Sequence, residues 1–213
     1  MFEVVKMLTE AEWNQALANR CGTDACYKLA QARVAVVGLG GLGSNIAILL
    51  VRMGINKLHL MDFDRVELCN LHRQQYSLEQ VGQLKTAALI KNLLDINPFL
   101  HYRIDNVRLT EANLAQYLSA DTYICEALDS PTDKAMLTNG VLTTWPDKYL
   151  VGANGMAGAG PADIVQTRKI NAHFYLCGDG CSDCSQEALV ASRVALCAAQ
   201  QAHVIYRLIL GLE

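Results

Sequence analysis

The segment VAVVGLGGLGSN constrains the fold of this chain more than any other. A short run rich in valine, residues 33–37, is followed by glycines and then by residues with helical spacing. Gly38, Gly40 and Gly43 match the pattern G-x-G-x-x-G. In that context glycine permits a tight turn, backbone N–H groups can approach a phosphate, and the helix N-terminus adds partial positive charge. The segment predicts a buried strand, a nucleotide-binding turn and a helix beginning near Gly43.

The same segment carries no charged residue from 34 to 51, a length compatible with a membrane span. Its glycines, followed by Ser44 and Asn45, divide the run into strand, turn and helix start, which favours a soluble protein. The N-terminus has no apolar region typical of a secretory signal, so we interpret the eight cysteines as belonging to a reducing cytoplasm.

Composition narrows the class of protein further. With 52% hydrophobic and 18% charged residues, the chain is too apolar to be disordered. A net charge of −3 gives no support to nucleic-acid or membrane-surface binding. A length of 213 residues suits an N-terminal helical segment, 1–30, followed by a single domain, 31–213.

Strand-like and helix-like patterns alternate along the rest of the chain, which predicts an α/β fold with a Rossmann-like, mainly parallel sheet and helices on both faces. The late strands lack intervening helices and predict an antiparallel extension near the C-terminus. Further strands are expected at 57–61, 101–104, 122–126, 149–153 and 162–167, and helices at 7–30 (with a break near 21–23), 43–53, 84–94, 111–118, 134–144 and 187–210.

Charged residues behind the second strand indicate which nucleotide is bound. Asp62 ends that strand at the offset where a carboxylate accepts ribose hydroxyls. Asn70 and Arg73 follow in DFDRVELCNLHRQQY, and Lys85 begins the next helix. A triphosphate suits an arginine fork and a lysine charge better than a dinucleotide pyrophosphate does. Two alternatives stay open: solvated charges without a ligand, and an NAD(P)-dependent oxidoreductase supported by the glycine turn and Asp62 alone.

Five segments, GLGGLGSN, DFDRVELCNLHRQQY, VGQLKTAAL, INP and ALDSPTDK, together resemble the ThiF/MoeB/HesA family of ubiquitin-activating-enzyme-like adenylyltransferases. The resemblance covers about residues 30–211. NLHRQ with its downstream lysine is specific to that family, whereas the glycine turn is not. The short length and the GDG element near the C-terminus are most similar to the short bacterial ThiF branch, which acts on the sulfur carrier ThiS in thiamine synthesis.

The resemblance implies a reaction. ATP with Mg²⁺ adenylates the C-terminal glycine carboxylate of a small ubiquitin-like carrier protein with a Gly-Gly tail, and pyrophosphate leaves. A carrier of the molybdopterin-synthase type is the alternative substrate. No general base is needed, because the carboxylate is ionised at neutral pH. A homodimer and an arginine reaching across it are also implied. Arg20 is the one weak candidate for that arginine, since Arg33 abuts a strand.

The resemblance also implies residue roles. Gly41 and the neighbouring glycines line the nucleotide, and Asp62 holds the ribose. Asn70, Arg73 and Lys85 face the phosphates, Arg73 and Lys85 acting catalytically. Asp129 binds Mg²⁺ or positions the triphosphate; capping of the next helix is its alternative role. The loop 154–161 is either a groove for the Gly-Gly tail or a flexible connector.

A cysteine cluster lies near the end of the chain. Cys177, Cys181 and Cys184 form C-x3-C-x2-C, and Cys181 with Cys184 is half of a possible zinc site. Only Cys197 follows, and we expect it on the core face of the last helix. Relatives carry a cysteine just before that helix that takes the activated acyl group or a persulfide. Cys184 has this position, where a helix N-terminus favours a thiolate, with Cys181 as its resolving partner. Incidental loop thiols are the third interpretation.

Overall fold

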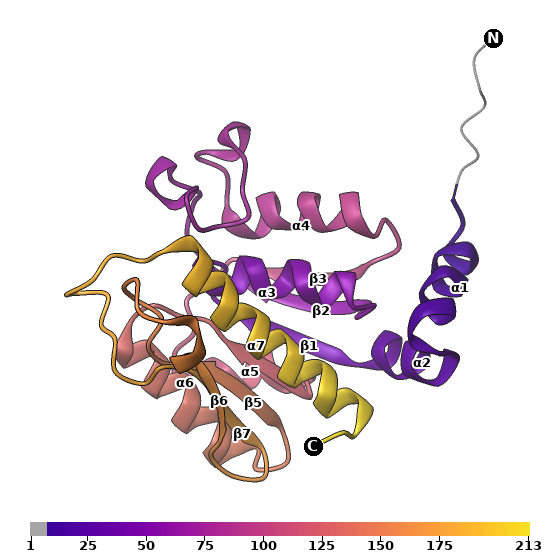
Figure 1. Ribbon diagram of the computed structural model, residues 1–213. Helices are drawn as coiled ribbons and strands as arrows, with labels where there is room; N and C mark the ends of the chain where they lie inside the picture. Colours follow the sequence, from indigo (N-terminus) through magenta and orange to yellow (C-terminus); the bar gives the residue numbers. More distant parts are fainter. Residues whose placement is uncertain (1–7) are drawn as a thin grey trace.

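The computed structural model describes residues 8–213 and contains a seven-stranded sheet in the order β3-β2-β1-β4-β5-β7-β6 (Figure 1). Neighbouring strands run parallel except β6 and β7, which are antiparallel. This confirms the Rossmann-like fold with an antiparallel extension. The strands are β1 (Arg33–Val37), β2 (Lys57–Met61), β3 (His101–Asp105), β4 (Tyr123–Glu126), β5 (Tyr149–Ala153), β6 (Gln166–Lys169) and β7 (Phe174–Gly178).

Helices cover both faces of the sheet because its central strands are apolar on both sides. Val34 and Val36 of β1 lie in one hydrophobic core with α2, α3, α4 and α7, while Ala35 and Val37 lie in a second core with α5 and α6. Side chains that alternate along a strand therefore serve two different cores. The helices are α1 (Glu10–Cys21), α2 (Thr23–Gln31), α3 (Gly41–Arg52), α4 (Lys85–Ile96), α5 (Leu114–Leu118), α6 (Pro131–Thr144) and α7 (Ala191–Leu210).

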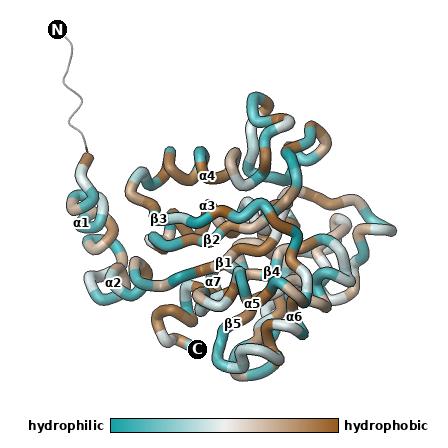
Figure 2. The backbone as a smooth tube through the Cα atoms, turned by 180° about the vertical axis from the view of Figure 1, so that it is seen from behind, coloured by the Kyte–Doolittle hydropathy of each residue, from teal (hydrophilic) through white to brown (hydrophobic). Residues whose placement is uncertain are grey.

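The first two helices lie beside each other at the end of the sheet where β1 begins (Figures 1 and 2). The break predicted near 21–23 is confirmed, since Gly22 separates α1 from α2 with φ of 88°. Helix α1 has a Thr9–Glu12 capping box but buries none of its residues. Hydrophobic and hydrophilic residues are mixed along it in Figure 2. Residues 1–7, with which the expected N-terminal segment begins, lie outside the described part.

Several predicted boundaries are wrong for identifiable reasons. Helix α6 begins at Pro131, three residues before the predicted start at 134. Ser130 caps it by accepting a hydrogen bond from the Asp133 N–H, and Pro131 occupies the first turn. Helix α7 begins only at Ala191, because the residues before it form a turn and extended chain. The predicted strand 162–167 contains a 3₁₀ turn before β6. Helices α3 and α5 also start elsewhere than expected, at Gly41 and Leu114.

Among residues 8–213, no helix has the length and apolar character needed to cross a membrane.

A buried histidine connects three parts of the sheet. The Nδ1 atom of His59 in β2 lies 2.7 Å from Oδ2 of Asp121, just before β4. Its Nε2 atom lies 2.8 Å from Oδ2 of Asp105 at the end of β3. Arg103 and Arg33 add cations, at 2.6 Å from Asp105 and 3.8 Å from Asp121. The ring of His59 therefore satisfies carboxylates that would otherwise be poorly solvated.

We predict that His59→Leu destabilises the fold by about 3 kcal/mol, because the buried Asp121 carboxylate would lose its side-chain hydrogen-bond partner. Urea unfolding measures the free energy. His101→Leu, on an exposed position of β3, is the matched control and should change stability by less than about 0.5 kcal/mol. Equal stability of the two variants would contradict this role for His59.

Candidate functional site

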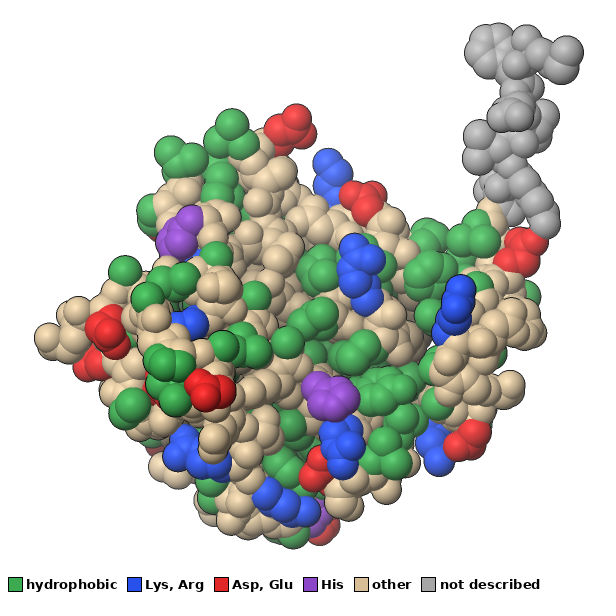
Figure 3. Space-filling view, viewed as in Figure 1, with side chains coloured by type: hydrophobic (Ala, Val, Ile, Leu, Met, Phe, Trp, Pro, Cys, Tyr) green, Lys and Arg blue, Asp and Glu red, His purple; other side chains and the backbone are tan. Residues whose placement is uncertain are grey.

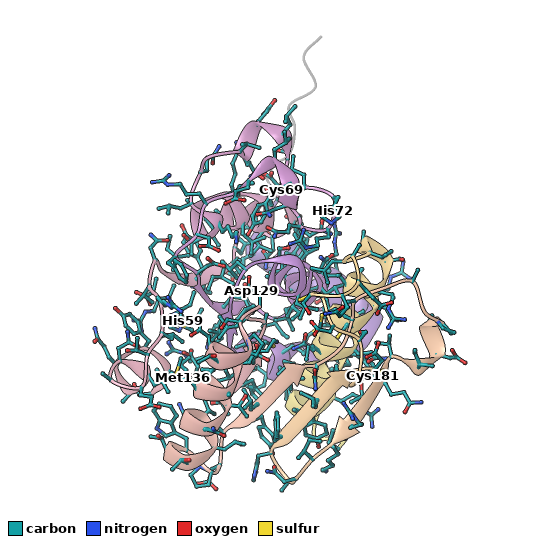
Figure 4. The ribbon with its side chains drawn as sticks, turned by 90° about the vertical axis from the view of Figure 1, so that its left-hand side faces the viewer. His59, Cys69, His72, Asp129, Met136 and Cys181 are labelled. Atoms are coloured by element: carbon teal, nitrogen blue, oxygen red, sulfur yellow. The ribbon has the colours of Figure 1, made fainter. Side chains whose placement is uncertain are left out.

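A cavity of about 650 Å³ lies at the carboxyl ends of the strands, beside the point between β1 and β4 where the strand order reverses. Figure 4 looks onto this end of the sheet, with Asp129 near its centre. Nearly all residues predicted for the site line this one cavity: Gly38, Gly40, Gly41, Asp62, Asn70, Arg73, Lys85, Asp129, Cys181 and Cys184. Gly43 is the exception.

The glycine turn is shaped by close backbone packing. Gly38 has φ of 88°, and a Cβ there would lie 2.6 Å from the carbonyl oxygen of Ala127. A Cβ on Gly43 would lie 1.8 Å from the carbonyl oxygen of Gly38. Gly43 is therefore needed for packing of helix against turn, beneath the cavity surface. Helix α3 begins at Gly41 without a side-chain cap, so its first N–H groups are available to an anion in the cavity.

Asp62 is held at the wall of the cavity by backbone donors. Its Oδ2 accepts the N–H of Leu39 at 2.6 Å, and its Oδ1 accepts the N–H of Asp64 at 2.7 Å. Burial raises the pKa of Asp62 above its ordinary value, because it outweighs the lowering by the charge of Lys85 and by these hydrogen bonds. Each oxygen keeps a second lone pair, so the carboxylate can still accept ribose hydroxyls. Lys85, which is 6% exposed, pairs with Asp64 at 2.9 Å.

Arg73 is positioned by the helix that follows the glycine turn. Asn45 of α3 donates to the carbonyl of Arg73 at 3.1 Å and accepts from Gln75 at 2.7 Å. The aliphatic part of the Arg73 side chain lies against Gly41. A Cβ on Gly41 would lie 3.5 Å from both Cγ and Cδ of Arg73. The guanidinium lies 3.4 Å from Nε2 of His72. Helix α3 thus presents its own N-terminus and an arginine to the same space.

A second ion pair, between Glu126 and Lys134, was not predicted from the sequence. Glu126 is 2% exposed and accepts the Leu128 N–H at 2.8 Å and the Lys134 ammonium at 2.9 Å. Lys134 also donates to the carbonyl of Ala153 at 3.1 Å and lines the cavity. The pair joins the end of β5 to the loop that carries the exposed Asp129. Lys134 stands in the quoted segment ALDSPTDK, but its contact with β5 depends on packing that no local pattern reveals.

Arg108 also lines the cavity, and no sequence signal indicated it. It pairs with Asp133 at 3.0 Å and lies over the ring of Phe63, 5.8 Å from its centroid. These two neighbours, Asp133 and Phe63, come from separate parts of the chain.

The late cysteines do not form one cluster. Cys177 is buried in β7, and burial raises the pKa of its thiol to about 11. Cys197 is buried on the core face of α7 as predicted, and burial raises its pKa to about 12. Cys181 and Cys184 are exposed at the cavity. In the described residues no three His, Cys, Asp or Glu side chains are placed to hold a metal ion, so this pair does not fit a structural zinc site.

Cys184 is also not where the sequence predicted. Helix α7 begins at Ala191, so the helix-dipole argument for a thiolate at Cys184 does not apply.

Comparison with known proteins assigns the family. The pattern of the ThiF family matches residues 13–213. The chain belongs to the ThiF family. It is 35% identical over 117 residues to the sulfur carrier protein adenylyltransferase of Thermus thermophilus, covering 54% of this chain and 43% of that protein. It is 35% identical over 130 residues to the tRNA threonylcarbamoyladenosine dehydratase of Escherichia coli, covering 59% and 48%. The chain thus spans about half the length of these curated relatives.

The fold of this ThiF-family chain matches that of a solved structure over nearly its whole length. The E. coli tRNA N6-threonylcarbamoyladenosine dehydratase in complex with ATP superposes with a TM-score of 0.85 at 22% identity. The match covers 96% of this chain and 97% of that one.

In this ThiF-family chain, Asp179 connects the loop that carries Cys181 and Cys184 to helix α7. Its Oδ1 accepts the N–H groups of Cys181 and Ser182, each at 2.8 Å, and its Oδ2 pairs with Arg193 of α7. Arg193 also donates to the carbonyl of Gly160 at 2.8 Å. Burial opposes ionisation, but the hydrogen bonds from Ser182 and Cys181 outweigh it and lower the pKa of Asp179 to about 2.

We predict an acid-dependent contribution of Asp179 to stability. Because its folded-state pKa of about 2 lies below the ordinary 3.8, the contribution is complete above pH 3.8 and is lost as the pH falls toward 2. Asp179→Asn should lower the free energy of unfolding at pH 6, and the difference from the parent should be much smaller at pH 2, where the folded-state carboxylate is about half protonated. Urea unfolding at both pH values measures it. A difference that does not depend on pH would contradict the assignment.

Proposed function

We propose that the chain is an ATP-dependent adenylyltransferase that activates the C-terminal carboxylate of a small ubiquitin-like sulfur carrier protein. One observation carries the proposal: a single cavity gathers an uncapped helix N-terminus, a carboxylate suited to ribose, and the cations of Arg73 and Lys85. The name of the T. thermophilus relative supports the reaction and the class of partner. We favour a ThiS-like carrier in thiamine synthesis, as in the short bacterial branch of the family; a molybdopterin-synthase-type carrier is the alternative.

The chemistry requires two anions to meet. The carrier carboxylate attacks the α-phosphate, a phosphorus–oxygen bond forms, and the bond to pyrophosphate breaks. Arg73, Lys85 and the amino end of α3 offset the charge that gathers on the phosphates. Asp129 is exposed at the cavity and fits a Mg²⁺ site of the kind that uses one carboxylate together with phosphates. When bound, Mg²⁺ would supply charge neutralisation at the leaving pyrophosphate.

The loop after β5 suits the carrier tail. Gly155 and Ala157 are buried at the cavity wall, and Gly155 has φ of 83°. Small residues let an extended Gly-Gly segment approach the backbone closely. The tail would then enter between this loop and the glycine turn, with its carboxylate directed at the α-phosphate.

Cys184 is our candidate acceptor of the activated carrier. Its thiolate would attack the acyl carbon of the carrier adenylate, so that a carbon–sulfur bond forms, the carbon–oxygen bond to the phosphate breaks and AMP leaves. Exposure of Cys184 at the cavity supports this role.

We also propose a homodimer. Arg20 is exposed on α1, at the opposite end of the sheet from the cavity (Figure 1). It would therefore meet nucleotide only in the cavity of a partner chain.

A protein carrier is a better candidate than tRNA. The E. coli relative is named for tRNA, and the two chains share their fold. On the face shown in Figure 3, however, Lys and Arg side chains are scattered rather than gathered into a patch, and the chain carries a net charge of −3.

Exchange of labelled pyrophosphate into ATP tests the adenylation step. We expect exchange that depends on a purified ThiS-like protein ending in Gly-Gly. Arg73→Ala should reduce it about 100-fold or more, because a donor to the developing charge is lost. Arg65→Ala is the matched control: Arg65 is exposed, donates to the carbonyl of Gly82 at 2.8 Å and lies outside the cavity. It should keep near-normal exchange.

Three outcomes would oppose the proposal. Exchange stimulated by tRNA instead of a carrier would change the substrate class, and tight NADH binding without exchange would indicate an oxidoreductase. Full exchange by Arg73→Ala would remove that residue from the reaction.

A covalent carrier adduct tests Cys184. We expect Cys184→Ser to keep pyrophosphate exchange and to lose the adduct, since only the second step needs a thiol. Cys181→Ser, an equally exposed thiol on the same loop, is the matched control and should keep both. Denaturing electrophoresis without reductant detects the adduct. An unchanged adduct in Cys184→Ser would move the role to another cysteine.

A further inference from the structure

Two thiols outside the cavity lie unusually close together. The Sγ atoms of Cys21, at the end of α1, and Cys26, in α2, are 2.8 Å apart. Gly22 lies between the two helices with φ of 88°, and this turn brings the sulfurs together. The sulfur of Cys21 also lies 3.1 Å from the carbonyl oxygen of Leu17. Both side chains are half-buried and reachable from solvent.

The distance selects the chemistry available to the pair. Two thiolates that share a tetrahedral metal ion at about 2.3 Å lie roughly 3.8 Å apart, so these sulfurs are too close to hold a metal between them. A disulfide needs about 2.05 Å, which a small shift of the side chains supplies. The pair is therefore arranged for a sulfur–sulfur bond rather than for chelation.

The position of the pair gives such a bond a consequence. Helix α1 buries none of its residues. Leu17 of α1 packs near Gly54: a Cβ added to Gly54 would lie 3.4 Å from Cδ1 of Leu17. Helix α2 is better anchored, because Leu29 is fully buried in the core. A covalent link between Cys21 and Cys26 would fasten the weakly held helix to the anchored one.

We propose that Cys21 and Cys26 are a redox modification site that disulfide-class oxidants, such as oxidised glutathione, convert to an intramolecular disulfide that fixes α1 on α2. The step is thiol–disulfide exchange. Cys21 attacks the small-molecule disulfide and releases one thiol; Cys26 then attacks the mixed disulfide at Cys21 and releases the second. The two cysteines lose two protons and two electrons, and the oxidant gains them as two thiols.

Cys26 suits the second of these steps. Burial and the neighbouring Cys21 raise the pKa of the Cys26 thiol to about 11, and the part that comes from Cys21 is lost once glutathione occupies Cys21. Attack within the pair is intramolecular, and the sulfurs are already in contact.

Peptide mapping tests the site sharply, because trypsin cleavage after Arg20 and Lys28 places both cysteines in one peptide, CGTDACYK. The full-length protein is equilibrated with oxidised glutathione, quenched in acid, denatured, alkylated and digested. We expect this peptide to be lighter than the dithiol form by two hydrogen atoms and to take no alkyl group. After reduction it should take two. A peptide that carries glutathione, or that stays fully alkylatable, overturns the proposal.

Two controls separate this pair from the other thiols. A variant with Cys69, Cys181 and Cys184 replaced by serine removes the exposed competitors and should give the same lighter peptide. Cys26→Ser should trap the mixed disulfide with glutathione on Cys21.

Amide hydrogen exchange of residues 10–21 measures the consequence for α1. Oxidation should slow it in the parent protein and leave it unchanged in Cys26→Ser. Equal exchange in the oxidised and reduced parent would overturn the claim that the bond fixes α1.

Discussion

The candidate site depends on how closely the glycine turn packs against its neighbours. Gly38 lies so near Ala127 that any side chain at position 38 would overlap the backbone at the end of β4. Gly43 meets the carbonyl of Gly38 from the other side. Because neither position carries a Cβ, β1, β4 and α3 converge at one point. The cavity lies beside that point, where a helix N-terminus and the ends of the parallel strands meet.

Three buried carboxylates extend this arrangement to the loops around the cavity. Asp62 binds the glycine turn to the end of β2, Glu126 joins β5 to the Asp129 loop through Lys134, and Asp179 attaches the cysteine loop to α7 through Arg193. Each carboxylate accepts backbone N–H groups as well as facing a cation, so the loops are fixed by directional bonds. This is the preorganisation that a charge-stabilising reaction requires.

Much of this was predictable from sequence, because the informative signals are local. The strand–glycine–helix pattern predicts β1 and α3, and valines in succession predict a strand buried on both faces. Asp62 follows from its offset from that turn, and Asn70 and Arg73 follow from their short distance along the chain from Asp62. Local patterns failed where tertiary contacts decide. Lys134 bonds to a carbonyl in β5, and Arg108 has no motif. Cys177 belongs to the cysteine pattern of the sequence, but its strand buries it away from Cys181 and Cys184. The start of α7 was misplaced because residues 184–190 form a turn and extended chain instead of helix.

We propose that this cavity binds ATP with its ribose on Asp62 and its phosphates between the start of α3, Arg73 and Lys85. A crystal structure with a non-hydrolysable ATP analogue tests it most directly. We expect hydrogen bonds from the ribose hydroxyls to the Asp62 carboxylate, with the α-phosphate facing Arg73. A nucleotide bound elsewhere, or one with its phosphates turned away from Arg73 and Lys85, would contradict it.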